Sequence, residues 1–213
     1  MRFGPVETAQ AEGAVLAHSI ALPSGRLRKG LRLEPAHLDA LRAEGIETVV
    51  VAQLASGDVD ENTAAAQVAQ AVLADHPYLT MTRAFTGRVN LLADGPGIVH
   101  LDVAALEALN AVHPMITLAT VPPFQQMAAG GMVATIKIIS YAVADHDLDA
   151  ACEAGRGAIR MLPPQIKDAT LIITEIDGGA GDKGKKAIAD RLSALDVTLK
   201  DIVIVPHEIS ALR

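Results

Sequence analysis

The chain has 213 residues, half of them hydrophobic and only 2% aromatic, and its formal net charge at pH 7 is −7. This length predicts one large or two small domains with a core of Ala, Val, Leu and Ile. The acidic balance and the scarcity of aromatic rings argue against a general nucleic-acid binder, which usually has a basic face and stacking platforms. Cys152 is the only cysteine, so neither an intrachain disulfide nor a thiolate zinc cluster is expected.

No targeting or membrane segment is visible in the sequence. The N-terminal residues lack the apolar stretch of a secretory signal. No apolar run approaches the ~20 residues that are needed to cross a bilayer, and the densest run, at residues 136–143, contains Lys137. We therefore expect a cytoplasmic protein that binds neither membranes nor nucleic acid.

Strands, turns and one helix are expected in the first 53 residues. Residues 13–22 are typical of a strand, residues 23–30 form a basic, turn-rich connection, and β-branched residues at 46–52 predict another strand. Between them, Pro35 suits the first turn of a helix and Gly45 suits its C-terminal cap.

The same alternation of helices and strands continues to about residue 154. Asp60 and Asp102 are expected to be the N-caps of two helices, the first of which runs to about Ala74. The other expected elements are short strands within 79–101, a strand at 116–121, one long strand at 132–143 and a polar helix from 145 to about 154.

Residues 169–213 are predicted to form a separate unit after a proline-containing linker, residues 161–168. Its expected elements are a strand at 169–176, a glycine-rich turn at 177–184, a helix at 185–195 and a strand at 202–205. One β-α-β unit cannot cover both faces of a parallel sheet. Either it packs onto the N-terminal part, or the chain is a fragment of a longer protein.

We predict an α+β fold in which a β-rich N-terminal region with short helices, residues 1–160, precedes the linker 161–168 and a partial α/β (β-α-β) module, residues 169–213. Residues 33–43 and 101–111 are identical at six of eleven positions. Two interpretations stay open. The regions at about 13–60 and 78–145 are related modules, or they merely share an alanine-rich capped helix.

The glycine-rich turn is the first candidate site, because a loop between a strand and a helix presents N–H groups and the helix dipole to an anion. Its spacing matches a phosphate loop, but Lys186 takes the place of the Ser or Thr that would hold magnesium. A nucleotide hydrolase is therefore disfavoured, and a solvated loop remains the simplest alternative. The candidate phosphate contacts are Gly181, Lys183, Lys185 and Lys186.

Other polar groups give weaker signals. No two histidines have the i, i+4 spacing of a helical metal site, and no catalytic triad can be drawn. The acidic residues at 58–61 and 145–147 are sufficiently explained as helix starts, with a cation site as the alternative. Arg83, Arg88 and Asn90 either face a ligand or belong to an exposed hairpin turn.

A series of short segments carries a family resemblance between residues 13 and 143. The segments are residues 13–20, 25–30, 45–46, 49–52, 58–61, 64–65, 85–91, 109–110, 116–120 and 132–139. In this order and spacing they resemble the N-terminal region of bacterial molybdopterin-binding proteins, some of which are fused to a nucleotidyltransferase. A weaker continuation at 169–213 resembles the opening of the α/β domain that holds the pterin in that family.

The resemblance implies a role in molybdenum-cofactor biosynthesis, with an activity like that of a molybdopterin molybdenumtransferase. The implied cofactor is molybdopterin, a pterin phosphate, with magnesium as a second option. The chain ends before the later glycine-rich turn and acidic residue that mark the pterin pocket. We therefore expect a shortened chain that is inactive alone. The alternative is a non-catalytic scaffold that binds a partner or forms a homo-oligomer.

Overall fold

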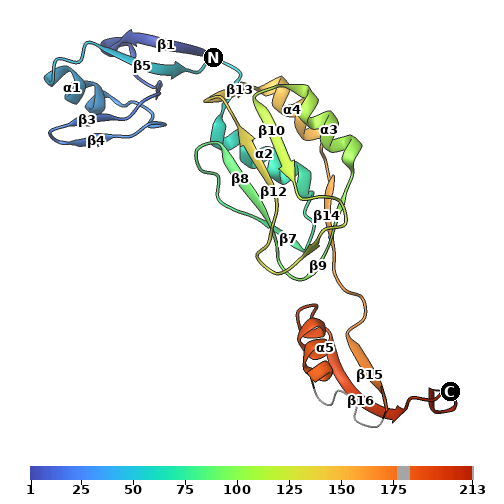
Figure 1. Ribbon diagram of the computed structural model, residues 1–213. Helices are drawn as coiled ribbons and strands as arrows, with labels where there is room; N and C mark the ends of the chain where they lie inside the picture. Colours follow the sequence, from blue (N-terminus) through green and yellow to red (C-terminus); the bar gives the residue numbers. More distant parts are fainter. Residues whose placement is uncertain (177–182, 213) are drawn as a thin grey trace.

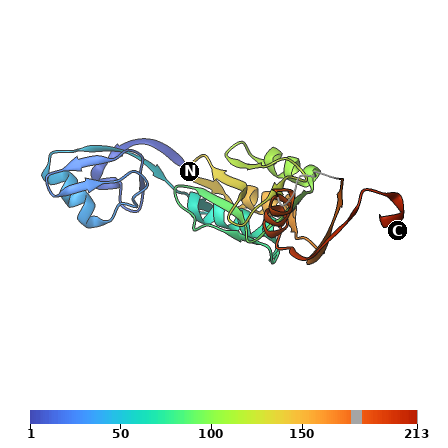
Figure 2. The ribbon, with the colours of Figure 1, turned by 60° about the horizontal axis from the view of Figure 1, so that its bottom comes forward.

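The computed structural model describes residues 1–176 and 183–212. Along the chain it forms an N-terminal unit (residues 1–53), a central unit (residues 58–162) and a C-terminal unit (residues 168–212), which follow one another in space (Figures 1 and 2). Within the described residues, no helix combines the length and the hydropathy that a bilayer crossing requires.

The N-terminal unit is a small antiparallel sheet beside a hairpin and one helix. Its elements are β1 (Arg2–Glu7), β2 (Val15–Leu16), β3 (Ile20–Leu22), β4 (Gly25–Leu27), α1 (Pro35–Ala43) and β5 (Thr48–Gln53), with a 3-10 turn at Thr8–Gln10. Strand β5 lies between β1 and β2, and β3 pairs with β4. The predicted helix start at Pro35 is confirmed, whereas the single strand predicted at 13–22 is wrong, because it is divided into β2 and β3.

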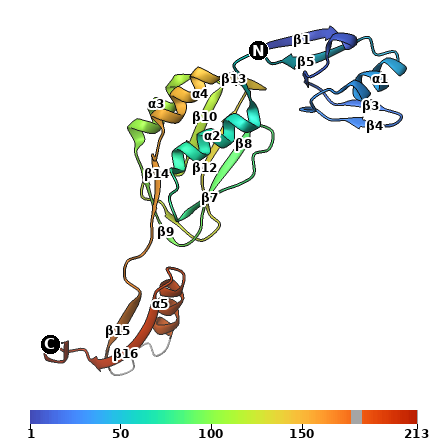
Figure 3. The same ribbon diagram turned by 180° about the vertical axis from the view of Figure 1, so that it is seen from behind.

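The central unit contains the larger core. Its strands are β6 (Asp58–Asp60), β7 (Leu79–Met81), β8 (Arg88–Ala93), β9 (Gly97–Leu101), β10 (Ile116–Thr120), β11 (Gln126–Met127), β12 (Met132–Ile138), β13 (Ala142–Ala144) and β14 (Ile159–Leu162). Its helices are α2 (Glu61–Leu73), α3 (Val103–Val112) and α4 (Asp145–Ala154). The main sheet has the order β10-β12-β8-β7. Helix α2 packs across β8 and β12 (Figure 3), and the core lies between them.

Two of the predicted helix caps are confirmed, and one predicted strand is wrong. The Asp60 carboxylate accepts hydrogen bonds from two backbone N–H groups at the start of α2, and the Asp102 carboxylate accepts one, from Ala105, at the start of α3. The strand predicted at 132–143 ends at Ile138 and resumes as β13, which leaves the main sheet and pairs with β6. The three residues between β12 and β13, 139–141, line the pocket described below.

The C-terminal unit consists of β15 (Asp168–Glu175), α5 (Lys183–Ser193), β16 (Thr198–Pro206) and a 3-10 turn at Ile209–Leu212. Strands β15 and β16 pair in parallel. Residues 163–167 connect this unit to β14, so the first two residues of the expected linker belong to a strand that pairs with β9.

The predicted fold class, α+β ending in a partial α/β module, is wrong. The chain is β-rich, with 38% of residues in strands against 29% in helices, and its strands form many small antiparallel sheets. An α/β module needs a parallel sheet that helices cover on both faces. Among the described residues the only parallel pair is the two-stranded β15–β16 with one helix, and large apolar side chains of both strands remain exposed, so no clear α/β module is formed.

Candidate functional site

The N-terminal and central units meet around Tyr141. Its hydroxyl donates a hydrogen bond to the carbonyl oxygen of Ala17 over 2.9 Å. Its ring stacks on Phe3 with centroids 5.9 Å apart, and the Lys29 Nζ lies 5.6 Å from its centroid, within the range of a cation–π contact. One residue of the central unit therefore makes three different contacts with the N-terminal unit.

A second contact between the two units is an ion pair. The N-terminal ammonium of Met1 lies 2.7 Å from the Asp58 carboxylate. This ammonium, followed by the backbone N–H of Ala55, holds the pKa of Asp58 below its ordinary value, because both hydrogen bonds favour the charged carboxylate. The junction between the units is thus polar and includes a charge-assisted hydrogen bond.

A pocket with a cavity of about 350 Å³ lies at this junction, and we call it the two-lysine pocket. It takes its side chains from both units: one lysine from the loop after β4, the other from β12, and the rest from the start of α2, the turn before β8 and the connection between β12 and β13. The lining residues are Lys29, Glu61, Thr86, Lys137, Ile139, Ser140 and Tyr141.

A tight hairpin turn at Thr86 and Gly87 forms one wall of the pocket. Phe85 and Arg88 exchange backbone hydrogen bonds of 3.1 and 3.0 Å across it. Both central residues have left-handed backbone angles, with φ of 48° and 69°, as a primed hairpin turn requires. Such a φ is unfavourable for a β-branched residue, and strain of this kind is concentrated at functional sites.

The neighbours of Gly87 explain why a glycine occupies this position. A Cβ at this position would lie 2.8 Å from the carbonyl oxygen of Ile138 and 3.0 Å from the Glu61 Oε2. The turn therefore packs directly on the end of β12 and on the side chain of Glu61. This close approach fixes Thr86 beside Lys137, whose ammonium donates a hydrogen bond to the Thr86 carbonyl oxygen.

The charges in the pocket do not balance. Two lysine ammonium groups oppose one carboxylate, that of Glu61, which leaves one excess positive charge at neutral pH. Burial is the main cause that raises the pKa of Glu61 above its ordinary value. The positive charges of Lys137 and Lys29 lower this pKa, and the negative charge of Asp60 raises it a little further. Lys137 and Glu61 are both half-buried, so their charges are less screened than those of fully exposed groups.

The hydrogen-bonding groups of the pocket suit an oxyanion. Lys137 uses one of its three N–H donors on Thr86, so two remain for a ligand. The Ser140 hydroxyl donates to the Ala142 carbonyl oxygen over 2.6 Å, so its one proton is already used and the two lysines are the donors that an anion would meet. Among the described residues, no group of three His, Cys, Asp or Glu side chains could hold a metal ion. These residues therefore offer no set of ligands for the magnesium ion considered from the sequence.

The site residues predicted from sequence lie elsewhere. Gly181 lies outside the described residues, and so does the side chain of Lys183, the first residue of α5. Lys185 and Lys186 are on α5 and do not line the two-lysine pocket. Lys186 forms an ion pair with Asp190, one turn further along the helix, at 2.7 Å.

The other polar candidates are also placed by the structure. Asp58 and Asp60 bind the N-terminus and cap α2, so both have structural roles. His146 lies 3.8 Å and 3.4 Å from its two flanking aspartates at the start of α4. The side-chain oxygen of Asn90 is buried without a described hydrogen-bond partner, opposite Thr135 in the next strand. None of these four residues lines the two-lysine pocket.

The residues that matter most in this pocket were not singled out from sequence. Lys29, Glu61 and Lys137 gave no motif signal, because each comes from a different part of the chain. Four of the segments quoted in the sequence analysis, residues 25–30, 58–61, 85–91 and 132–139, each contribute at least one lining residue. The pocket is therefore assembled from segments that are far apart in the sequence.

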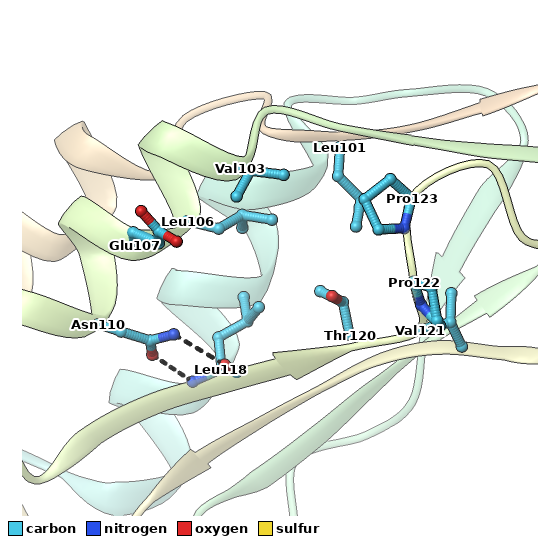
Figure 4. A pocket seen from close by; sticks show the side chains of 10 residues that line it. All are labelled: Leu101, Val103, Leu106, Glu107, Asn110, Leu118, Thr120, Val121, Pro122 and Pro123. Carbon is cyan, nitrogen blue, oxygen red and sulfur yellow. Dashed lines mark hydrogen bonds between the residues drawn. The ribbon is translucent and has the colours of Figure 1, made fainter.

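A second hollow, between α3 and β10, is a weaker candidate (Figure 4). Its cavity of about 380 Å³ is mainly apolar, with Leu106 and Leu118 on facing walls. The Asn110 side chain bonds both the N–H and the carbonyl oxygen of Leu118, at 2.8 and 2.9 Å, so it already has partners. Glu107 is the only ionisable group in its lining, which gives this hollow little basis for specific recognition.

Comparisons with known proteins identify one part of the chain. Residues 5–53 match the model of a family described as a domain of unknown function (DUF8806). No curated protein and no solved structure matches the chain. The matched segment ends at Gln53, the last residue of β5, so it coincides with the N-terminal unit, which supplies Lys29 to the pocket.

Proposed function

We propose that this chain binds a small phosphate-bearing molecule in the two-lysine pocket. The observation that carries the proposal is the convergence of Lys29 and Lys137, from two different units, on one cavity with an excess positive charge. The lysine ammonium is a compact charge that commonly binds phosphate. Its attraction to an anion is stronger in a partly enclosed cavity than on an open surface.

The first ligand to test is molybdopterin. The segments that resemble molybdopterin-binding proteins supply lining residues of the pocket, and this supports a role in molybdenum-cofactor biosynthesis. In this proposal the pocket residues hold the phosphate end of the pterin. We place the protein in the cytoplasm, which accords with its single cysteine.

Calorimetric titration of inorganic phosphate and of molybdopterin into three proteins tests the proposal. These are the wild type, Lys137→Met and Lys186→Met. Loss of a charge-assisted hydrogen bond should weaken binding about tenfold in Lys137→Met, since such bonds contribute roughly 1.5–3 kcal/mol. Lys186→Met should bind like the wild type. A loss confined to Lys186→Met would move the site to the glycine-rich turn and contradict the proposal.

A non-catalytic scaffold is the second candidate, on the strength of one observation. The C-terminal unit exposes large aliphatic side chains on both of its strands, including Ile172, Ile202 and Ile204. Exposed apolar strands of a small sheet favour association. Sedimentation velocity across a concentration series tests this: a dimer that is indifferent to phosphate, and that is lost in Ile172→Thr, would support the scaffold.

A further inference from the structure

We propose that the ligand of the two-lysine pocket carries a positively charged amine beside its phosphate, and that Glu61 selects this amine. The inference rests on the phosphate binding proposed above and narrows its ligand class. It names the class of ligand as a small amphoteric phosphate, in which the phosphate meets Lys29 and Lys137 while the amine meets the Glu61 carboxylate. Molybdopterin, whose pterin amino group is uncharged at neutral pH, falls outside this class, so a preference for molybdopterin over an aminated phosphate would overturn the inference and leave phosphate binding intact.

The position of Glu61 is the first argument, because its surroundings leave it little freedom. It is the first residue of α2, directly after the Asp60 cap, and its backbone N–H donates to the Tyr141 carbonyl oxygen over 3.0 Å. On one side Gly87 packs so closely that a Cβ there would lie 3.0 Å from Oε2 and 3.1 Å from the Cβ of Glu61. Its carboxylate therefore belongs to the pocket wall.

The balance of charge is the second argument. A phosphate monoester carries almost two negative charges near neutral pH, which would neutralise Lys29 and Lys137. The half-buried Glu61 carboxylate would then repel the ligand, and Asp60, next to it, adds to that repulsion. An amine on the ligand removes the excess charge and gives Glu61 a hydrogen-bond partner.

An anion without an amine should bind in a different way. With such a ligand, Glu61 must take up a proton before the charges balance, and the raised pKa of this carboxyl brings that step closer to neutral pH. Because a phosphate monoester itself takes up a proton near pH 6, the effect of Glu61 is measured against Glu61→Gln at the same pH. This variant should bind a plain phosphate more tightly than the wild type at pH 7, by a margin that shrinks as the pH falls.

Two matched probes test the inference: 3-aminopropyl phosphate and propyl phosphate, which differ only by the amine. We expect the wild type to prefer the aminated probe about tenfold at pH 7, the effect of a single charge-assisted hydrogen bond. Glu61→Gln should lose most of this preference. Glu107→Gln, at the apolar hollow, is the matched control and should keep it.

The outcomes separate the inference from the function on which it rests. Equal affinity of the two probes for the wild type, or a preference that survives in Glu61→Gln, would overturn the inference and leave phosphate binding intact. If neither probe binds, or if Lys137→Met binds both like the wild type, the proposed function itself fails.

Because Glu61→Gln could perturb α2, its circular dichroism is compared with that of the wild type. The pH dependence of propyl phosphate binding gives a second readout: if the ratio of the Glu61→Gln affinity to the wild-type affinity does not fall between pH 7 and pH 5, the inference is also overturned.

Discussion

The central and C-terminal units have similarly β-branched strands but bury them very differently. Ile136 of β12 and Ile159 of β14 are fully buried, whereas Ile172 of β15 is 56% exposed and Ile204 of β16 is 47% exposed. The central sheet is covered by α2, which packs on β8 and β12. In the part of the chain that the structure describes, the two-stranded β15–β16 sheet is contacted by α5 and by the short turn at Ile209–Leu212, both on β16. Burial therefore depends on a second layer and not on the hydrophobicity of a strand alone. The two-lysine pocket is built on the well-packed unit.

The largest predicted difference between these units concerns core truncation. Leu109→Ala removes a fully buried side chain of α3 and should lower the free energy of unfolding by about 3 kcal/mol. Ile172→Ala, on the exposed strand β15, should lower it by less than about 0.5 kcal/mol. Urea denaturation measures both. Similar losses in the two variants would show that β15 is buried in solution.

The next effect concerns the turn that forms the pocket wall. Gly87→Ala should cost about 2 kcal/mol of stability, because the new methyl group meets the Ile138 carbonyl oxygen and the backbone has a left-handed φ. The control is Gly130→Ala, where φ is also left-handed at 75° but a Cβ would have open space. It should cost only about 1 kcal/mol. If urea denaturation shows that both variants lose the same free energy of unfolding, the close packing around Gly87 does not contribute to stability.

A smaller effect is expected at the cap that positions Glu61. Asp60→Ala removes the carboxylate that accepts from the backbone N–H groups of Asn62 and Thr63, each at 3.1 Å. The expected loss is about 1 kcal/mol. Glu153→Ala, an exposed change near the end of α4, is the control. An Asp60→Ala protein as stable as this control would show that the α2 cap contributes little.

The smallest effect concerns pH and the junction between the N-terminal and central units. The pKa of Asp58 is lowered in the folded protein, so its stabilising contribution is present above its unfolded value of about 3.9 and is lost as the pH falls through the folded value. Asp58→Asn should therefore show a weaker fall in melting temperature than the wild type between pH 5 and pH 3. Identical pH profiles of melting temperature would contradict a stabilising Met1–Asp58 pair.

Local features of the sequence predicted the helix boundaries well. Asp60, Asp102 and Pro35 each act within one helical turn, so their roles depend only on neighbouring residues. The strand from 132 to 143 was predicted wrongly because its apolar residues continue past Ile138. The chain leaves the sheet there through pairing between β13 and β6, a contact between distant segments that composition does not encode.

The site was harder to predict than the helices for the same reason. Lys29 and Lys137 are separated by more than half of the chain, and no spacing rule connects them. The glycine-rich turn attracted attention because its motif is contiguous. The fold class was predicted wrongly because two strands and a helix satisfy the β-α-β pattern locally, whereas an α/β module is defined by further strands and a covering layer.

The most direct test of the central claim is a titration of the isotopically labelled protein with inorganic phosphate, followed by amide chemical shifts. We predict that the largest shift changes occur at Gly87, Ser140 and Tyr141, around the two-lysine pocket, and that in Lys137→Met they require about tenfold more phosphate. Changes concentrated at Lys185 and Lys186, at the start of α5, would contradict the account and place anion binding at the glycine-rich turn.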